Sequence, residues 1–195
     1  MTETIDFAAQ ARLVSQLAAR TAEEQLDDPT PCEEYAVRHL LGHLVGLSAA
    51  FQEAARKNIG PVTSVDPGAE VPDVAPGWRE ELDRNLRGMA EAWHAPEAWE
   101  GETQAGGVTL PAAVAGRFAL NELVLHGWDL ARATGQEYAP DRAGLGVSYA
   151  LLAPLAESPE RGPFGRPVAV AADAPLLDQV VALSGRRPGW TPPAA

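Results

Sequence analysis

The sequence of 195 residues contains a single cysteine, Cys32, and a single lysine, Lys57. One cysteine cannot form an intramolecular disulfide or a zinc site of several cysteines, and sparse cysteine use is typical of a reducing compartment. The opening segment MTETIDFAAQ lacks the basic and apolar parts of a signal peptide. The apolar runs are far shorter than the ~20 residues of a membrane-spanning helix. We therefore expect a soluble, cytoplasmic protein.

Positive charge is also scarce. The chain has 15 Lys and Arg residues against 27 Asp and Glu residues, which gives a formal net charge of −12. A nucleic-acid-binding protein needs a basic surface to neutralise phosphates, and an anionic membrane attracts basic segments. The charge balance therefore argues against both nucleic acid and membrane as partners.

Hydrophobic periodicity predicts a mostly helical chain. Apolar residues recur at helical spacing over about 5–21, 35–57, 78–93, 110–134 and 141–155, and Gly135 follows the fourth of these segments as a helix cap would. The proline-rich segment 60–77 predicts a long connection, RPVAV (166–170) a short strand and PLLDQVVALSG (175–185) a last helix. Four substantial helices with one long crossover favour an all-α four-helix bundle with a small C-terminal elaboration.

Three ionisable residues interrupt the apolar stripes of two of these helices. Glu122 and His126 are four residues apart, so they share a helix face, and His43 lies among Leu40, Leu47, Ala50 and Ala54. An ionised carboxylate buried without a partner costs several kcal/mol, and a divalent metal would satisfy it together with the imidazoles. Two histidines and one carboxylate would leave an open metal position for water or substrate.

Simpler roles for these three residues stay open at this point. A core histidine is often hydrogen-bonded to a carbonyl or a hydroxyl, and a Glu-x-x-x-His pair on one helix face also occurs as a plain ion pair. The spacing alone does not choose between these roles and a metal site.

Asp129 and His39 are candidates for supporting the ligands. Asp129 follows His126 by three residues, so it is placed to hydrogen-bond a metal-bound imidazole, although packing or capping would also explain it. His39 precedes His43 by four residues on a neighbouring line of the helix. It could act as an acid–base group or a spare ligand, and a position at the pocket rim or surface is favoured.

The single cysteine and three arginines complete the set of candidates. Cys32 is interpreted as a small buried residue rather than a reactive thiol. Arg132, Arg186 and Arg187 could recognise an anionic ligand, and a surface position is expected for each.

Two segments of the sequence resemble a known family. TPCEEYAVRHLLGHLVG (30–46) and ELVLHGWDLARATGQ (122–136) resemble the two motifs of the DinB-like, mycothiol-dependent maleylpyruvate isomerase superfamily. The end of the chain, from GRPVAV to LLDQVVALSGRRPGW, is similar to the tail of an actinobacterial branch described as metal-binding proteins. The resemblance implies an up-down-down-up four-helix bundle with a divalent metal between helices, held by His43, Glu122 and His126. Tyr35 stands where the family usually has tryptophan.

The resemblance also implies a chemistry. Zinc is the metal it favours, although nickel and iron suit the same ligands, and mycothiol or a similar thiol is the expected cofactor. The function would be transfer of that thiol to a small electrophile, or isomerisation of the electrophile. A non-catalytic metal- or small-molecule-binding stress protein is the alternative, and a bundle that only dimerises is a weaker one. The characterised isomerases have a larger C-terminal domain that contributes to substrate binding, so their substrate is not carried over to this chain.

From these observations we expect two parts. Residues 1–157 would form the DinB-like metal-binding bundle, and residues 158–195 a short tail packed on it. The expected partners are a small-molecule thiol and an electrophile, and a homodimer through helix faces is the oligomer considered.

Overall fold

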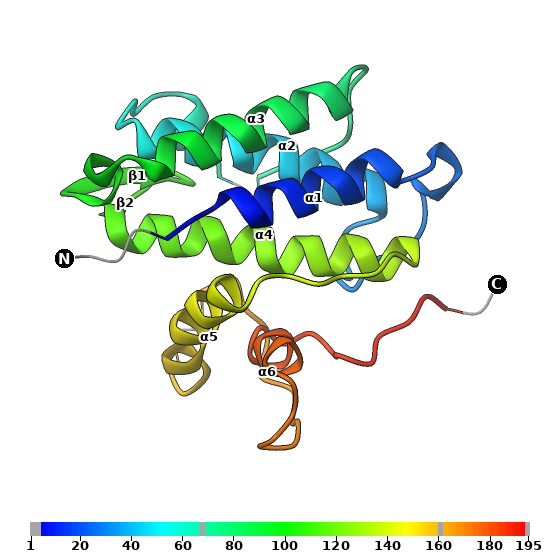
Figure 1. Ribbon diagram of the computed structural model, residues 1–195. Coiled ribbons are helices and arrows are strands. Elements are labelled where there is room, and N and C mark those ends of the chain that lie inside the picture. Colours follow the sequence, from blue (N-terminus) through cyan, green and yellow to red (C-terminus); the bar gives the residue numbers. More distant parts are fainter. Residues whose placement is uncertain (1–4, 67–68, 160–161, 194–195) are drawn as a thin grey trace.

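A computed structural model describes residues 5–66, 69–159 and 162–193. The described chain is mostly helical (Figure 1). The helices are α1 (Ala8–Arg20), α2 (Val37–Ala55), α3 (Trp78–His94), α4 (Ala112–Thr134), α5 (Arg142–Ala156) and α6 (Leu176–Leu183), with short 3₁₀ turns η1 (Glu23–Gln25), η2 (Val62–Ser64) and η3 (Pro96–Trp99). An antiparallel hairpin of β1 (Glu102–Ala105) and β2 (Val108–Pro111) leads into α4.

Helices α1 to α4 form the four-helix bundle. Both α1 and α2 pack against α3 and α4, and in Figure 1 α1 and α4 run in one direction while α2 and α3 run in the other. The long connection after α2 leads the chain back to the end of the bundle where α2 begins. Helix α3 therefore runs in the same direction as α2, and the topology is up-down-down-up. The apolar stripes predicted from the sequence meet in one core, whose members include Leu40, Leu44, Leu82, Leu86, Leu120 and Leu123, all 0% exposed.

The last two helices lie on the outer side of α4. A second apolar cluster joins them to it and consists of Val124, Leu125, Leu145, Leu152 and Val180. Helix α4 is therefore packed from both sides, which explains why almost its whole length is buried. Side chains on α4 can consequently contact both the bundle and the C-terminal segment.

The helix predictions are confirmed within a few residues at their ends. Gly135 caps α4 with a φ of 68°, in the left-handed region that glycine adopts without strain. The strand predicted at 166–170 is wrong: among the described residues no strand pairs with this segment, and Val168 instead donates its backbone N–H to the carbonyl of Ala182 at the end of α6. The β1–β2 hairpin was not predicted.

The boundary at residues 157 and 158 stays a prediction, although α6 and the residues after it do contact α4. No helix in the described part of the chain is both long enough and apolar enough to cross a membrane.

Candidate metal centre

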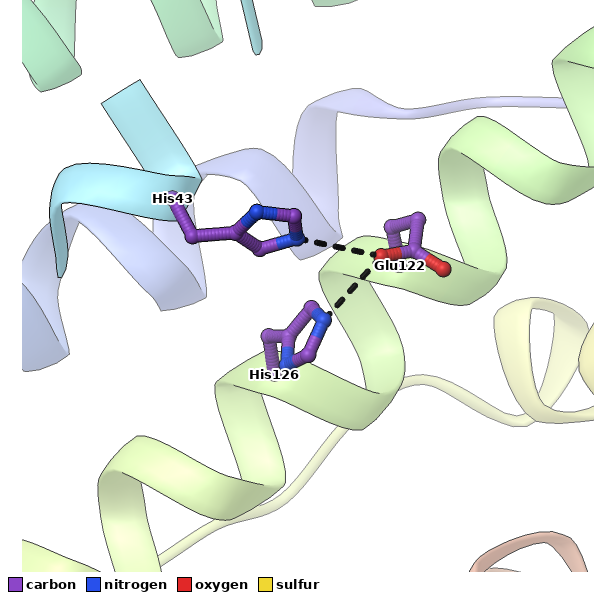
Figure 2. Close-up of side chains that lie close together, drawn as sticks. All are labelled: His43, Glu122 and His126. Atoms are coloured by element: carbon purple, nitrogen blue, oxygen red, sulfur yellow. Dashed lines mark ion pairs between the residues drawn. The ribbon is translucent and has the colours of Figure 1, made fainter. Parts of the chain in front are cut away.

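The structure brings His43, Glu122 and His126 together on facing sides of α2 and α4 (Figure 2). One ligand atom from each residue lies within 4.8 Å of the others. Oε2 of Glu122 is 3.0 Å from Nε2 of His126 and 3.6 Å from Nε2 of His43. Both imidazoles thus point the same type of nitrogen at one carboxylate. In the described part of the chain no fourth residue joins this group.

The three side chains lie at the edge of the bundle core. Their side-chain exposed fractions are 20% for Glu122, 15% for His43 and 10% for His126. Each side chain is thus mostly shielded from bulk water, while a small part of it remains open to the surface.

Asp129 supports His126 from the far side of the imidazole ring. Its Oδ2 lies 3.0 Å from Nδ1 of His126, and its side chain is completely buried. Burial would raise the pKa of Asp129, but Arg186 and the hydrogen bonds to Arg186 and His126 hold that pKa below its usual value. Because an ionised carboxylate only accepts hydrogen bonds, Nδ1 of His126 must be the donor. This leaves Nε2 facing Glu122.

Electrostatics within the group favour charged forms. Burial would raise the pKa of Glu122, yet hydrogen bonds and charge interactions with His126 and His43 hold it well below its usual range. Burial would lower the pKa of His126, but its contacts with Asp129 and Glu122 raise it to about 9. The structure thus describes a carboxylate that is ionised and surrounded by imidazole nitrogens.

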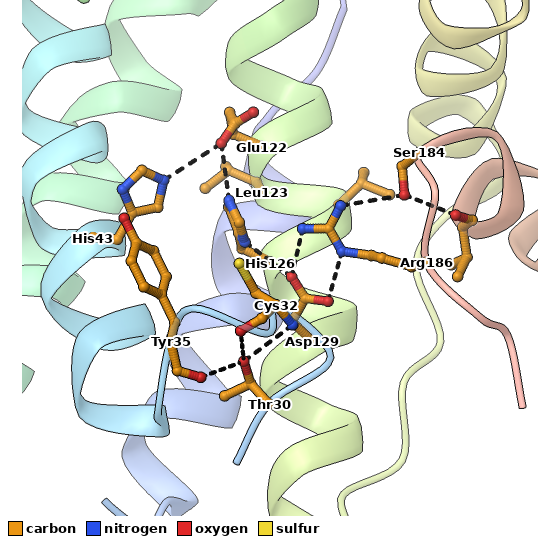
Figure 3. A network of polar contacts seen from close by, with 12 residues as sticks. Thr30, Cys32, Tyr35, His43, Glu122, Leu123, His126, Asp129, Ser184 and Arg186 are labelled. Atoms are coloured by element: carbon orange, nitrogen blue, oxygen red, sulfur yellow. Dashed lines mark hydrogen bonds and ion pairs between the residues drawn. The ribbon is translucent and has the colours of Figure 1, made fainter. Parts of the chain in front are cut away.

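Arg186, for which a surface position was expected, lies against Asp129. Arg186, which follows α6, donates from Nε to Oδ1 of Asp129 at 2.7 Å and from Nη2 to Oδ2 at 2.8 Å (Figure 3). Its side chain is only 14% exposed. The surface expectation for Arg186 is therefore wrong, because a fully buried carboxylate needs a buried cation to compensate it. Arg132 donates to the backbone carbonyl of Trp190, and Arg187 is exposed.

The remaining candidates lie around the group without joining it. Nδ1 of His39 accepts a hydrogen bond from the backbone N–H of Ala36 at the start of α2. The His39 ring contacts Tyr35, whose own ring lies 5.6 Å from that of His43. Tyr35 therefore lies beside both histidines, and His39 does not belong to the group of three.

Cys32 is close to this site but is not an activated thiol. Burial, together with the negative charge of Asp129, raises the pKa of Cys32 to about 11. A thiol with such a pKa is almost entirely protonated at neutral pH and is a poor nucleophile. Any thiolate chemistry at this site would therefore need a thiol from outside the chain.

Comparison with known proteins identifies relatives over most of the chain. The model of the family described as "Mycothiol maleylpyruvate isomerase N-terminal domain" matches residues 7–131. Two uncharacterized proteins of Mycobacterium tuberculosis, one from strain CDC 1551 / Oshkosh and one from strain ATCC 25618 / H37Rv, are each 29% identical over 176 residues. These cover 87% of this chain and 90% of each relative.

Two solved structures share the fold. Both are of the mycothiol-dependent maleylpyruvate isomerase, one of them a variant with a histidine replaced by alanine, and they have 17% and 16% sequence identity with TM-scores of 0.54 and 0.53. The similarity covers 75% of this chain and 66% of each isomerase chain. This chain therefore spans slightly less than two thirds of the length of those proteins, and at this identity the likeness concerns the fold alone.

Proposed function

The chain belongs to the mycothiol maleylpyruvate isomerase N-terminal domain family, and we propose that it is a metal-dependent enzyme that uses a low-molecular-weight thiol. His43, Glu122 and His126 would hold a divalent metal ion, with zinc as the first choice. The thiol would be of the mycothiol type, and the reaction its transfer to a small electrophile or the isomerisation of that electrophile.

The observation that carries the proposal is the donor set itself. Two imidazole nitrogens and a carboxylate oxygen lie within 4.8 Å of one another at a partly exposed position. These are ligand types that zinc, nickel and iron accept, and three protein ligands are typical of catalytic rather than structural zinc sites. The group that Figure 2 shows therefore offers three protein ligands to a metal ion, whose remaining coordination position would be left to an exogenous ligand.

The charges of the surrounding residues also fit a divalent cation. Glu122 and Asp129 are ionised, and Arg186 balances one of the two negative charges. A divalent ion between neutral imidazoles would leave one net positive charge, which an anionic sulfur ligand would balance. When bound, the metal would lower the pKa of a coordinated thiol and so supply a thiolate at neutral pH.

The residues of this chain would then have distinct tasks. Asp129 keeps the proton on Nδ1 of His126, so that Nε2 is available as a ligand. The ring of Tyr35 lies beside that of His43, with the ring centroids 5.6 Å apart, and would limit the access of water to it. Burial raises the pKa of Cys32 to about 11, which disfavours its thiolate as a competitor of the incoming thiol.

A titration calorimetry experiment with mycothiol tests the proposal. We expect the zinc-loaded wild-type protein to bind mycothiol and to bind S-methylated mycothiol at least about tenfold more weakly, because only the free thiol can ionise. The His126→Ala variant serves as the control without an intact ligand set and should bind neither strongly. Absence of binding to wild type, or equal binding of both compounds, would overturn the role of the thiol.

One observation favours a second candidate, a non-catalytic metal- or small-molecule-binding protein. About one third of each solved isomerase chain has no counterpart in the structural match. A site that binds metal and thiol without turning over any electrophile would support this second function. Turnover assays with a panel of small electrophiles and mycothiol distinguish the two.

A further inference from the structure

We propose that Arg186 is a positioning residue for the metal centre and acts on His126 through Asp129. This inference rests on the proposed function, because it assumes that His43, Glu122 and His126 hold a metal. Arg186 itself touches none of these three side chains by a hydrogen bond or ion pair; its contacts are with Asp129 and Ser184. Its role is therefore to hold Asp129 in place, and Asp129 in turn orients the ligand His126.

The geometry forms a continuous chain of polar contacts from the C-terminal segment to the site (Figure 3). The guanidinium holds both carboxylate oxygens of Asp129, at 2.7 and 2.8 Å, in the two-point arrangement that arginine makes with carboxylates. Oδ2 of Asp129 lies 3.0 Å from Nδ1 of His126. Ser184 accepts a hydrogen bond from Nη1 of Arg186 at 3.2 Å and so restrains the guanidinium on its other side.

The burial of Asp129 makes it dependent on Arg186. Asp129 is completely buried, so water cannot replace Arg186 as its partner. Without the guanidinium, the carboxylate would be free to rotate away from Nδ1 of His126. The imidazole would then lose the acceptor that fixes its orientation, and His126 would become a poorer ligand.

The location of Arg186 adds to what the family match provides. The match ends at residue 131, whereas Arg186 belongs to the segment after α6. Helix α6 itself is anchored on the outer side of α4 through the cluster that contains Val180. The elaboration after the bundle would therefore do more than cover α4: it would complete the support of a ligand inside the bundle.

Metal affinity of matched variants tests this inference directly. We expect Arg186→Met to weaken the binding of zinc, measured by competition with a chromogenic chelator, by about 10- to 100-fold relative to wild type. Arg132→Met is the control, because Arg132 also ties the C-terminal segment to α4, through the Trp190 carbonyl, but does not touch Asp129. Zinc affinity of Arg132→Met should stay within about twofold of wild type.

A double-mutant cycle distinguishes action through Asp129 from a general loss of stability. If Arg186 acts through Asp129, Asp129→Asn and the double variant with Arg186→Met should bind zinc with similar affinity, so that the two losses do not add. Should Arg186→Met not fold, Arg186→Lys takes its place; it retains a charge but cannot hold both oxygens, and a loss of at least about threefold is expected.

The possible outcomes separate this inference from the proposed function. If wild type does not bind zinc, the metal proposal itself fails. If wild type binds zinc but the Arg186 variants bind equally well, or Arg132→Met loses as much affinity, the positioning role is overturned alone. Additive losses in the cycle would overturn it as well.

Discussion

His126 lies between two carboxylates, with Glu122 at Nε2 and Asp129 at Nδ1. Such a position stabilises an imidazolium in the metal-free protein, which explains why the pKa of His126 is raised to about 9 although burial opposes it. A metal ion at Nε2 would have to displace that proton. Proton and metal therefore compete for one nitrogen atom.

This competition predicts how stability depends on pH. Since the folded-state pKa of His126 is raised above its unfolded value of 6.5, its stabilising contribution is complete below pH 6.5 and is lost as pH rises through about 9. The Tm of the metal-free protein should therefore fall over this window by more than that of His126→Ala. Excess zinc should raise the wild-type Tm more at pH 8 than at pH 6. A metal-free Tm that rises from pH 6.5 to 9 would contradict this account.

The stabilising contributions of the two carboxylates change with pH in the opposite direction to that of His126. The pKa values of Glu122 and Asp129 are lowered from 4.5 and 3.8, so their contribution is present above these values and is lost as pH falls. In the metal-free protein, His126, Glu122 and Asp129 therefore all contribute to folding stability together between about pH 4.5 and 6.5.

Helix α4 packs closely against aromatic rings at a position where only a small residue fits. A Cβ atom at Gly116 would lie 2.6 Å from the ring of Trp99 and 2.8 Å from that of Trp93. Trp93 is completely buried and stacks on Phe7 at a ring separation of 5.8 Å. This aromatic cluster thus has little room in which to move.

We predict opposite effects of alanine at two helical glycines. Gly116→Ala should destabilise the protein by about 1–3 kcal/mol through overpacking against the tryptophans. Gly46→Ala, in α2, should stabilise it by up to about 1 kcal/mol, because a Cβ atom there meets nothing within 4 Å and alanine favours the helix. Thermal unfolding should show a shift of about 2–4 °C per kcal/mol in each direction. Equal Tm changes of the same sign would contradict the packing described for α4.

Local patterns account for which elements could be predicted. The long helices were predictable because their apolar residues recur every three or four positions over many turns. The β1–β2 hairpin was missed although Gly106 and Gly107 stand between two short segments, a known turn signal. The segment 166–170 has strand-like residues but no neighbouring strand to pair with, so tertiary context overrode its composition.

At the scale of the whole molecule, α4 carries the site while α2 and the C-terminal segment complete it from two sides. Helical spacing was enough to select Glu122 and His126, and the apolar surroundings of His43 added the third candidate. The partnership of Arg186 with Asp129 was not predictable, because it joins residues 57 positions apart through the packing of α5 and α6. Residue type alone gave no signal that this arginine is buried.

The family match and the fold agree with the expectation from the sequence. The proposed function rests on a divalent metal ion held by His43, Glu122 and His126. The roles proposed for the thiol and for Arg186 both depend on that ion.

Elemental analysis of protein purified without added metal shows whether these residues hold such an ion. We expect about one equivalent of a divalent metal per chain in wild type and less than about a tenth of that in His126→Ala, because loss of one of three ligands abolishes tight binding. His39→Ala is the matched control, since it removes a histidine from the same helix as His43 but leaves the group intact, and its metal content should equal that of wild type. Equally negligible metal in wild type and His126→Ala would contradict the account.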